Sequence, residues 1–506
     1  MTSTSPYARH SSQEIDATAA AQDVANKPPN LAALPLVVDL DGTLTPTDTL
    51  VESVVQVVKR QPLTVLQFPF WLMRGRAAFK EQIASRTRFS VENLPIREAL
   101  MSYIRAEKAT GRKIVLATAA HRSIAEQVAI RFPVFDAVLA SAAGHNLKGT
   151  AKLAAIEELV GPHFAYAGDS AADLPIWAKA DAAILVGAPA RVTQAVRKDR
   201  PVEREFPSTP VDLALWLRAM RVHQWAKNLL LFVPLLTGFA FLELEKLATI
   251  IGAFIAFSLA ASATYMVNDL WDLDSDRAHP RKCKRPFASG AITIKAGVGV
   301  AAVLLGCALA LATWLSSAFL LMLAVYLVLT CAYSWVLKEY VLIDVVMLSI
   351  LYTVRIIAGS VAAHVSVSTW LLAFSVFMFL SLALVKRCAE LVSLAQSGRI
   401  AASGRDYRVT DLTVLWPLGC GASLSAVVVL GLFISAPDTQ ARYATVQLLW
   451  LVAIGLVYWI ARVWIKTSRG EMHDDPLVFA LKDFGSGVTI ALMLAATLAA
   501  HFLHLG

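Results

Sequence analysis

The hydrophobic pattern of the chain changes character near residue 225. Before this point the apolar runs are short and interrupted by charged residues, whereas beyond it they repeatedly reach the roughly 20 residues that cross a bilayer as a helix. Nine candidate spans follow Trp225, centred near residues 236, 258, 304, 326, 352, 378, 424, 454 and 494. The pattern therefore predicts two domains, the second of which is an all-α, multi-pass membrane bundle.

The front part alternates short apolar strands with helical stretches. Strand patterns are found at Leu36–Val38, Lys113–Ala117 and Phe164–Ala167, and polar residues follow the C-terminal end of each. Helical patterns at Arg122–Arg131 and Leu153–Val160 lie between them. This alternation predicts a parallel α/β sheet, whose ligands bind beyond the carboxyl ends of the strands.

These patterns divide the chain into four parts. Residues 1–33 are rich in Ser, Ala, Thr and Gln and lack the apolar core of a signal peptide, so we expect a disordered cytoplasmic tail. The remaining parts are an α/β domain at 34–196 with a helical cap at about 50–105, a proline-containing linker at 197–216, and the membrane domain at 217–506.

Composition and charge agree with a membrane location. A hydrophobic content of 57% and a mean hydropathy of +0.57 exclude an ordinary soluble protein. The net charge of +8 could indicate nucleic acid, but the Lys and Arg residues of the second half gather in short loops between apolar spans. Since such loops face the cytoplasm, we expect no nucleic-acid partner, and an integral protein of the plasma membrane, the inner membrane in a bacterium, with its front domain in the cytoplasm.

The cap contains an aromatic stretch, Leu66–Met73, that is too short to span a bilayer. Two interpretations remain open. The residues either pack inside the cap, or Phe70 and Trp71 lie in a membrane interface, where aromatic rings are favoured.

A first set of polar residues follows the predicted strands. Asp39-Leu40-Asp41-Gly42-Thr43 places two carboxylates two residues apart, and Thr118, Lys152 and Gly168-Asp169-Ser170-Ala171-Ala172-Asp173 follow in order. This ordered set resembles the haloacid dehalogenase phosphatases, and the helical insertion is similar to their phosphoserine-phosphatase-type cap. The resemblance implies a HAD-like Rossmannoid domain with magnesium-dependent phosphatase activity.

The same resemblance implies a role for each residue. Asp39 would be the nucleophile that forms an aspartyl-phosphate, and Asp41 the general acid and base. Thr118 and Lys152 would hold the phosphate, although Lys148 is close enough in sequence to replace Lys152. Asp39, Asp169 and Asp173 would hold Mg²⁺. A domain that binds phosphate without hydrolysing it is the alternative, but every catalytic position is filled.

A second set of acids follows the second predicted span, in Asn268-Asp269-Leu270-Trp271-Asp272-Leu273-Asp274-Ser275-Asp276. Asp269, Asp272 and Asp276 are spaced three and four apart, so on a helix they share one face. Like charges at this spacing repel unless a divalent cation neutralises them, and a magnesium-bound diphosphate is the expected ligand. The motif resembles the signature of the UbiA superfamily, and the resemblance covers residues 217–506.

Within that superfamily the chain resembles the polyprenyl-phosphate (decaprenyl-phosphate) phosphoribosyltransferases. The resemblance rests on the segments 221–228, 279–280, 285–290 and 473–476 and on Tyr333, Lys338, Asp344, Arg355, Lys386 and Arg387. Members that transfer a prenyl group usually carry a second acidic cluster after the fourth span, where this chain has only Asp344. Arg355 within a span either faces the site or pairs with a helix carbonyl or a nearby acid.

The resemblance therefore implies transfer of 5-phosphoribosyl from phosphoribosyl diphosphate, a soluble donor, to a polyprenyl phosphate lipid, with Mg²⁺ as cofactor. The front domain is expected to remove the 5-phosphate of the product. The residues implied in metal–diphosphate or substrate binding, besides the three acids, are Lys227, Asn268, Arg285, Tyr333, Lys338, Asp344, Arg355, Lys386 and Arg387. The alternatives are a prenyltransferase that acts on an aromatic or other small acceptor, and an inactive protein that binds lipid phosphates.

Overall fold

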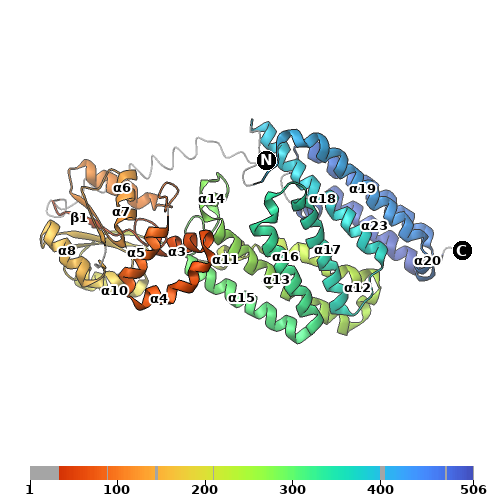
Figure 1. Cartoon of the computed structure of the whole chain (residues 1–506), viewed down its shortest axis with the longest axis horizontal. Coiled ribbons are helices and arrows are strands. Elements are labelled where there is room, and N and C mark those ends of the chain that lie inside the picture. The colour runs from red at the N-terminus through yellow and green to blue at the C-terminus, as the bar shows by residue number, and fades with distance from the viewer. Residues whose placement is uncertain are drawn as a thin grey trace. The chain divides into compact units, whose positions relative to one another are not determined.

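The computed structural model describes residues 33–87, 89–142, 146–208, 210–398, 405–472 and 476–504 (Figure 1). The tail expected at residues 1–33 lies outside these ranges except for its last residue. The chain divides into two compact units. The front unit comprises the residues up to Ala219 together with Met266–Val300, and the bundle unit comprises Met220–Tyr265 and the residues from Ala301 onward. The acidic motif that follows the second predicted span therefore belongs to the front unit.

The front unit contains a six-stranded, wholly parallel sheet with the strand order β3-β2-β1-β4-β5-β6. The strands are β1 (Leu36–Val38), β2 (Ile114–His121), β3 (Ala137–Ser141), β4 (Ala165–Gly168), β5 (Ala182–Val186) and β6 (Val202–Phe206). The order reverses at β1, which pairs with β2 on one side and β4 on the other. Such a switch point is where ligands bind in open parallel sheets, and the predicted α/β fold is confirmed.

Helices cover both faces of this sheet (Figure 1). Leu36 and Val38 face α6 (Glu98–Ala109) and α7 (Arg122–Arg131), whereas Val37 faces the opposite side. That side is covered by α8 (Thr150–Val160), α9 (Leu174–Trp177) and α10 (Ala190–Asp199). Because alternate residues of β1 point to opposite faces and both faces are covered, the strand reads as a continuous apolar run.

Most of the segment 197–216, which was expected to be a linker, belongs to helices and a strand. Residues 197–199 end α10, β6 pairs with β5 as the sixth strand, and α11 begins at Leu213 and ends at Ala219. A buried arginine explains why the charged strand β6 joins the sheet. The guanidinium of Arg112 pairs with Glu203 of β6 at 2.7 Å and with Glu107 at 2.8 Å.

We expect Glu203→Ala to destabilise the front unit by about 3–5 kcal/mol, because the substitution removes one partner of a buried ion pair and leaves Arg112 undercompensated. Thermal unfolding of the front unit in the full chain, followed by limited proteolysis, would measure the loss. The matched control is Glu205→Ala, two residues along the same strand, which removes a surface ion pair with Arg197. That change should cost at most about 1 kcal/mol. Equal effects of the two substitutions would contradict the role of the buried pair.

The cap is shorter than the predicted 50–105. It consists of α3 (Thr49–Arg60), the 3-10 helix η1 (Pro62–Gln67), α4 (Phe68–Met73) and α5 (Arg76–Arg86). Its interior is formed around Val57, Trp71 and Ile83. Helix α6 instead packs on the sheet through Leu100, which is fully buried.

Cap helix α3 also contacts the segment Met266–Val300 of the same unit. Arg277 Nη1 and Nη2 donate to the two carboxylate oxygens of Glu52 at 2.8 and 2.7 Å. Both side chains are at most 5% exposed. A two-pronged, charge-assisted contact of this kind fixes orientation as well as distance.

The bundle helices confirm eight of the nine predicted spans. Among the described residues, eight helices are long and apolar enough to cross a membrane. They are α13 (Leu244–Trp271), α15 (Ile294–Leu315), α16 (Ser317–Trp335), α17 (Ile343–Ala363), α18 (Thr369–Gln396), α19 (Leu412–Ser435), α21 (Leu449–Ser468) and α23 (Phe484–Phe502). Short helices connect or flank them: α14 (Leu273–Ala278), η5 (Lys282–Lys284), η6 (Leu337–Glu339), η7 (Val409–Asp411), α20 (Pro437–Arg442), η8 (Val446–Leu448) and α22 (Pro476–Lys482).

The span predicted near residue 236 is wrong as a single helix. The chain forms η3 (Val222–Phe232), α12 (Val233–Thr237) and η4 (Ala240–Leu242) in succession. Pro234 is the second residue of α12, and Phe239 has a left-handed backbone with φ of 53°. These residues interrupt a continuous α-helical hydrogen-bond ladder. A Cβ atom on Gly359 of α17 would meet the carbonyl oxygen of Leu231 at 2.1 Å, so the glycine allows η3 to pack directly on α17.

Candidate functional site

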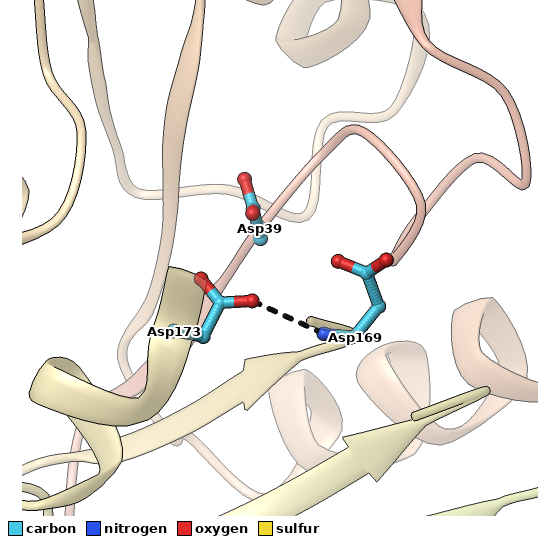
Figure 2. Close-up of side chains that lie close together, drawn as sticks. All are labelled: Asp39, Asp169 and Asp173. Atoms are coloured by element: carbon cyan, nitrogen blue, oxygen red, sulfur yellow. Dashed lines mark hydrogen bonds between the residues drawn. The ribbon is translucent and has the colours of Figure 1, made fainter. Parts of the chain in front are cut away.

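Three carboxylates of the front unit converge at the switch point of the sheet. Asp39 follows β1, Asp169 follows β4, and Asp173 lies on the short helix η2 (Ala171–Asp173). One carboxylate oxygen from each residue lies within 4.8 Å of the others. Figure 2 shows the three side chains, with the backbone N–H of Asp169 donating to Asp173 Oδ2 at 3.3 Å. Because hard oxygen ligands suit Mg²⁺, this set can hold the ion.

A lysine and a tyrosine position the candidate nucleophile. Asp39 Oδ1 accepts a hydrogen bond from the N–H of Leu40 at 2.8 Å and lies 2.9 Å from Lys152 Nζ. Lys152 also donates to the hydroxyl of Tyr166, which donates to Asp173 Oδ1, both at 2.8 Å. Lys152 is therefore the lysine that contacts the cluster, whereas Lys148 is exposed on the rim of the same pocket.

Asp41, the candidate general acid and base, is held by the cap. Its Oδ1 accepts from the N–H of Thr49, the first residue of α3, at 2.8 Å. Gly42 between the two loop segments has a φ of 79°, and a Cβ atom there would lie 2.2 Å from Asp169 Oδ2. Glycine is thus required at this position both for its backbone conformation and for the close approach of the carboxylate.

Burial raises the pKa of these carboxyl groups. The pKa of Asp169 rises to about 7 because of burial and the nearby charges of Asp173 and Asp39. The pKa of Asp41 also rises to about 7, through burial and the charge of Asp48. Burial raises the pKa of Asp39 as well, although Lys152 opposes the shift. Mutually repelling acids in a buried cluster are the electrostatic condition under which a divalent cation binds well.

We expect the affinity of the front unit for Mg²⁺ to rise as the pH increases from 6 to 8. Protons compete with the cation for Asp169, whose pKa lies at about 7, and this competition disappears once the carboxyl group is ionised. Calorimetric Mg²⁺ titrations of the full chain in buffers of different ionisation enthalpy would show proton release that decreases at high pH. Asp169→Asn should reduce both the affinity and the proton release. A pH-independent affinity in the unsubstituted protein would contradict the proton competition.

The pocket above the cluster has a volume of about 800 Å³. Thr118 does not line it: the side chain is fully buried, and its hydroxyl accepts from the N–H of Ala120 at 3.0 Å. Lys80 and Arg97 are among the lining residues that the sequence does not predict. Lys80 of α5 donates to the carbonyl of Ala119 at 2.6 Å, and Arg97, which precedes α6, donates to the carbonyl of Gly42. No local motif marks either residue, so only the three-dimensional contacts identify them.

The acidic motif of the second half does not form one straight helical face. Helix α13 ends at Trp271, and α14 begins after Asp272. Asp269 and Asp276 both accept from Arg285 Nη1, at 3.1 and 2.5 Å, and both are at most 3% exposed. Within the part of the chain that the structure describes, the carboxylates of Asp269, Asp272 and Asp276 do not come as close together as those of Asp39, Asp169 and Asp173. The guanidinium of Arg285 provides the positive charge that Asp269 and Asp276 share.

A second polar cluster lies inside the bundle unit. Arg355 of α17 is 5% exposed and donates to Asn228 Oδ1 and to the hydroxyl of Tyr326, both at 2.9 Å, and to the carbonyl of Leu351. Within the described ranges Arg355 makes no ion pair with a carboxylate. Lys227, next to Asn228, is also buried. An intramembrane cation held by neutral groups retains its full charge for a ligand.

Asp344 and Arg387 form a different arrangement from the one that the sequence suggested. Arg387 is fully buried, lies 2.6 Å from Asp344 Oδ2, and also pairs with Glu390. Asp344 also accepts a hydrogen bond from the hydroxyl of Tyr407 at 2.5 Å. The two predicted substrate-binding residues therefore neutralise each other. Each of the remaining predicted residues is placed on a bundle element: Tyr333 on α16, Lys338 on η6 and Lys386 on α18, whereas residues 473–475 lie outside the described part of the chain.

The comparisons with known proteins match both parts of the chain. Residues 231–480 match the UbiA prenyltransferase family, and residues 36–177 match the haloacid dehalogenase-like hydrolases. An uncharacterized protein of Sinorhizobium fredii is 38% identical over 92% of this chain and 90% of its own length. The decaprenyl-phosphate phosphoribosyltransferase of Mycolicibacterium smegmatis is 32% identical over 53% of this chain and 86% of its own length.

Among solved structures, a UbiA homolog from Archaeoglobus fulgidus bound to GPP and Mg²⁺ is similar, with a TM-score of 0.43 and 16% identity. The match covers 57% of this chain and 100% of that one. The apolar helices and the sequence relatives together make the chain an integral membrane protein. It belongs to the UbiA prenyltransferase family and carries a haloacid dehalogenase-like hydrolase domain ahead of its membrane domain.

Proposed function

We propose that the membrane domain transfers a 5-phosphoribosyl group from phosphoribosyl diphosphate to a polyprenyl phosphate, and that the hydrolase domain removes the 5-phosphate of the product. Phosphoribosyl diphosphate is proposed as the donor because of the contacts that Asp344 makes. This acid stands where prenyl-transferring relatives are expected to carry a second acidic cluster, and here Arg387 and Tyr407 each contact one of its two carboxylate oxygens. The relative named decaprenyl-phosphate phosphoribosyltransferase supports the same choice.

In the transferase reaction the bond between the anomeric carbon and the diphosphate breaks, and an oxygen of the lipid phosphate forms the new bond to that carbon. Asn268, Asp269, Asp272 and Asp276 are the residues we assign to the metal–diphosphate. Magnesium bound there would neutralise the leaving group. Lys227 and Arg355 are the buried cations we assign to the other phosphates. The lipid phosphate is already an anion, so this step requires no strong base.

In the hydrolase reaction Asp39 attacks the phosphorus atom while the ester oxygen leaves with a proton from Asp41. Oδ1 of Asp39 is held by Leu40 and Lys152, so Oδ2 is the attacking oxygen that we assign. Water then cleaves the aspartyl-phosphate, and Asp41 accepts its proton. The raised pKa of Asp41 favours the protonated form that the first step needs, because the group loses its proton only as the pH rises through about 7.

The product of the transferase reaction can reach the hydrolase domain if both active sites open to the cytoplasm. We propose this orientation from the clustering of Lys and Arg in the loops on one side of the bundle. The product of phosphoribosyl transfer carries one phosphomonoester, which is the substrate class of the Asp39 site. Only the residues from Pro207 to Arg221 separate β6 from η3, so the two domains remain at high local concentration.

The donor can be tested directly with purified protein in lipid nanodiscs. We expect radiolabel from phosphoribosyl diphosphate to enter the lipid fraction when polyprenyl phosphate and Mg²⁺ are present. Labelled prenyl diphosphate with an aromatic acceptor serves as the competing donor. Incorporation from the prenyl donor alone would replace the phosphoribosyl assignment by prenyl transfer, and lipid binding without either turnover would indicate a binding protein.

A further inference from the structure

One face of the cap exposes large apolar side chains in a helical pattern. Leu63 and Leu66 of η1 and Phe70 and Met73 of α4 are 80%, 71%, 67% and 85% exposed. Their spacing of three, four and three residues places them on one side of successive helical turns. We call these four residues the apolar cap face. Single exposed apolar residues are ordinary, but a contiguous group of this size marks an interaction surface.

The apolar cap face is not required to fill the cap itself. Trp71 points the opposite way, is 7% exposed and packs against Phe68 and Phe79, with ring centroids 6.5 Å or less apart. The interpretation that both Phe70 and Trp71 lie in a membrane interface is therefore wrong for Trp71. Phe70 remains available for another surface.

The charged residues nearest to the apolar cap face in sequence are positive. Arg60 precedes it, Arg74 and Arg76 follow it, and all three side chains are exposed. The sequence from Ser53 to Lys80 contains no Asp or Glu. An apolar strip with arginines at both ends suits the surface of a bilayer that contains anionic lipids, because the strip can enter the acyl boundary while the arginines meet the phosphates.

A contact within the front unit connects this region to a membrane helix. Lys59, at the end of α3, donates to the carbonyl of Trp271 at 2.8 Å. Trp271 is the last residue of α13, one of the helices long and apolar enough to span a membrane. The apolar cap face begins only four residues after Lys59. The apolar cap face therefore follows closely in sequence on a residue that contacts the end of a helix long enough to span a membrane.

We propose that the apolar cap face and its flanking arginines bind the surface of an anionic bilayer and thereby hold the hydrolase pocket next to the membrane. The pocket is lined by Leu50 of α3 and by Lys80 and Ile83 of α5, the two helices that border the apolar cap face in sequence. A lipid whose headgroup carries a phosphomonoester then reaches Asp39 while its chain stays in the bilayer. This last consequence rests on the proposed function, whereas the membrane contact does not.

Photo-cross-linking in the full chain tests the membrane contact. A benzoylphenylalanine residue would be introduced at position 66, 70 or 73, and the protein irradiated in nanodiscs that contain radiolabelled phosphatidylglycerol. Position 130 is the matched control, because Ile130 is equally exposed at 80% but belongs to α7, a helix that packs on the sheet and is not part of the cap. We expect at least tenfold more labelled lipid at the three cap positions than at position 130. Equal yields would overturn the proposal, as would cross-links to a second copy or to the bundle in place of lipid.

A second experiment separates the membrane contact from the reaction. The triple substitution Leu66→Gln, Phe70→Gln and Met73→Gln should leave hydrolysis of the soluble ester p-nitrophenyl phosphate unchanged. Hydrolysis of a phosphomonoester lipid in anionic nanodiscs should fall about tenfold, and Ile130→Gln should change neither rate. If the unsubstituted protein hydrolyses the soluble ester but not the lipid, the proposed function fails while the cross-linking result still decides the membrane contact. Unchanged lipid hydrolysis in the triple variant would overturn the proposal that the apolar cap face holds the pocket next to the membrane.

Discussion

Replacing Asp276 by Asn should lower lipid transfer on the order of 10³-fold while the front domain continues to hydrolyse soluble phosphate esters. The substitution removes one negative charge from the set that we assign to the metal–diphosphate, and several kcal/mol of charge stabilisation disappear with it. The fold should survive, since Asp269 still accepts from Arg285 and the amide keeps the shape of the carboxylate. Transfer of labelled phosphoribosyl to lipid measures the loss.

The chain offers a matched control within the same motif. Asp274 lies two residues away on α14, is exposed, and contacts Gln56 through weak hydrogen bonds of 3.4 Å. Asp274→Asn makes the same chemical change outside the proposed ligand set and should retain nearly full transfer. Near-normal transfer by the Asp276 variant, or an equal loss in both variants, would remove Asp276 from the metal–diphosphate site.

Replacing Asp39 by Asn should stop hydrolysis by at least ~10³-fold and cause the 5-phosphorylated ribosyl lipid to accumulate. The amide cannot attack phosphorus, but it retains the shape of the side chain and can accept from the N–H of Leu40. Lys152 stays close to Tyr166 and Asp173, so the pocket should remain folded. Mass spectrometry of the lipids formed from phosphoribosyl diphosphate and polyprenyl phosphate gives the readout.

The control for the Asp39 variant is the same substitution at an aspartate outside the pocket. Asp199→Asn at the exposed end of α10 removes the same charge from the same domain and should yield the dephosphorylated lipid, as the unsubstituted protein does. Identical lipid products from the Asp39 variant and the unsubstituted protein would show that the hydrolase domain acts on another phosphate. The transferase assignment would be unaffected by that outcome.

The parts of the fold that the sequence predicts are those with a strong local signal. Strands β1, β2 and β4 were predicted because apolar runs end there in recognisable polar motifs. Strand β6 was missed because Glu203 and Arg204 interrupt its apolar pattern, and its charge is accommodated by Arg112 from a neighbouring part of the fold. The segment near Pro234 was predicted as one span because hydropathy alone does not register a broken hydrogen-bond ladder.

The residues of the candidate sites divide in the same way, into those with a local sequence signal and those that only tertiary contacts reveal. The motif acids Asp39, Asp169 and Asp173 were predicted, and the structure brings them together because strand ends in a parallel sheet share one edge. Lys80, Arg97 and Tyr166 were not predicted, since each depends on a contact between segments far apart in sequence. The mutual neutralisation of Asp344 and Arg387 is likewise a tertiary property, because 43 residues separate them.

The contact between Glu52 and Arg277 has a consequence for how such a two-domain chain can evolve. The acid lies in the hydrolase cap, and the arginine lies beyond the first membrane helix, on the other side of the 46-residue segment Met220–Tyr265. A single genetic crossover in the short stretch between the domains would bring in a foreign cap without a matching acid and leave a nearly buried guanidinium uncompensated. Exchange of hydrolase domains among relatives should therefore succeed mainly between lineages that have kept both partners, and substitutions at the two positions should be inherited together.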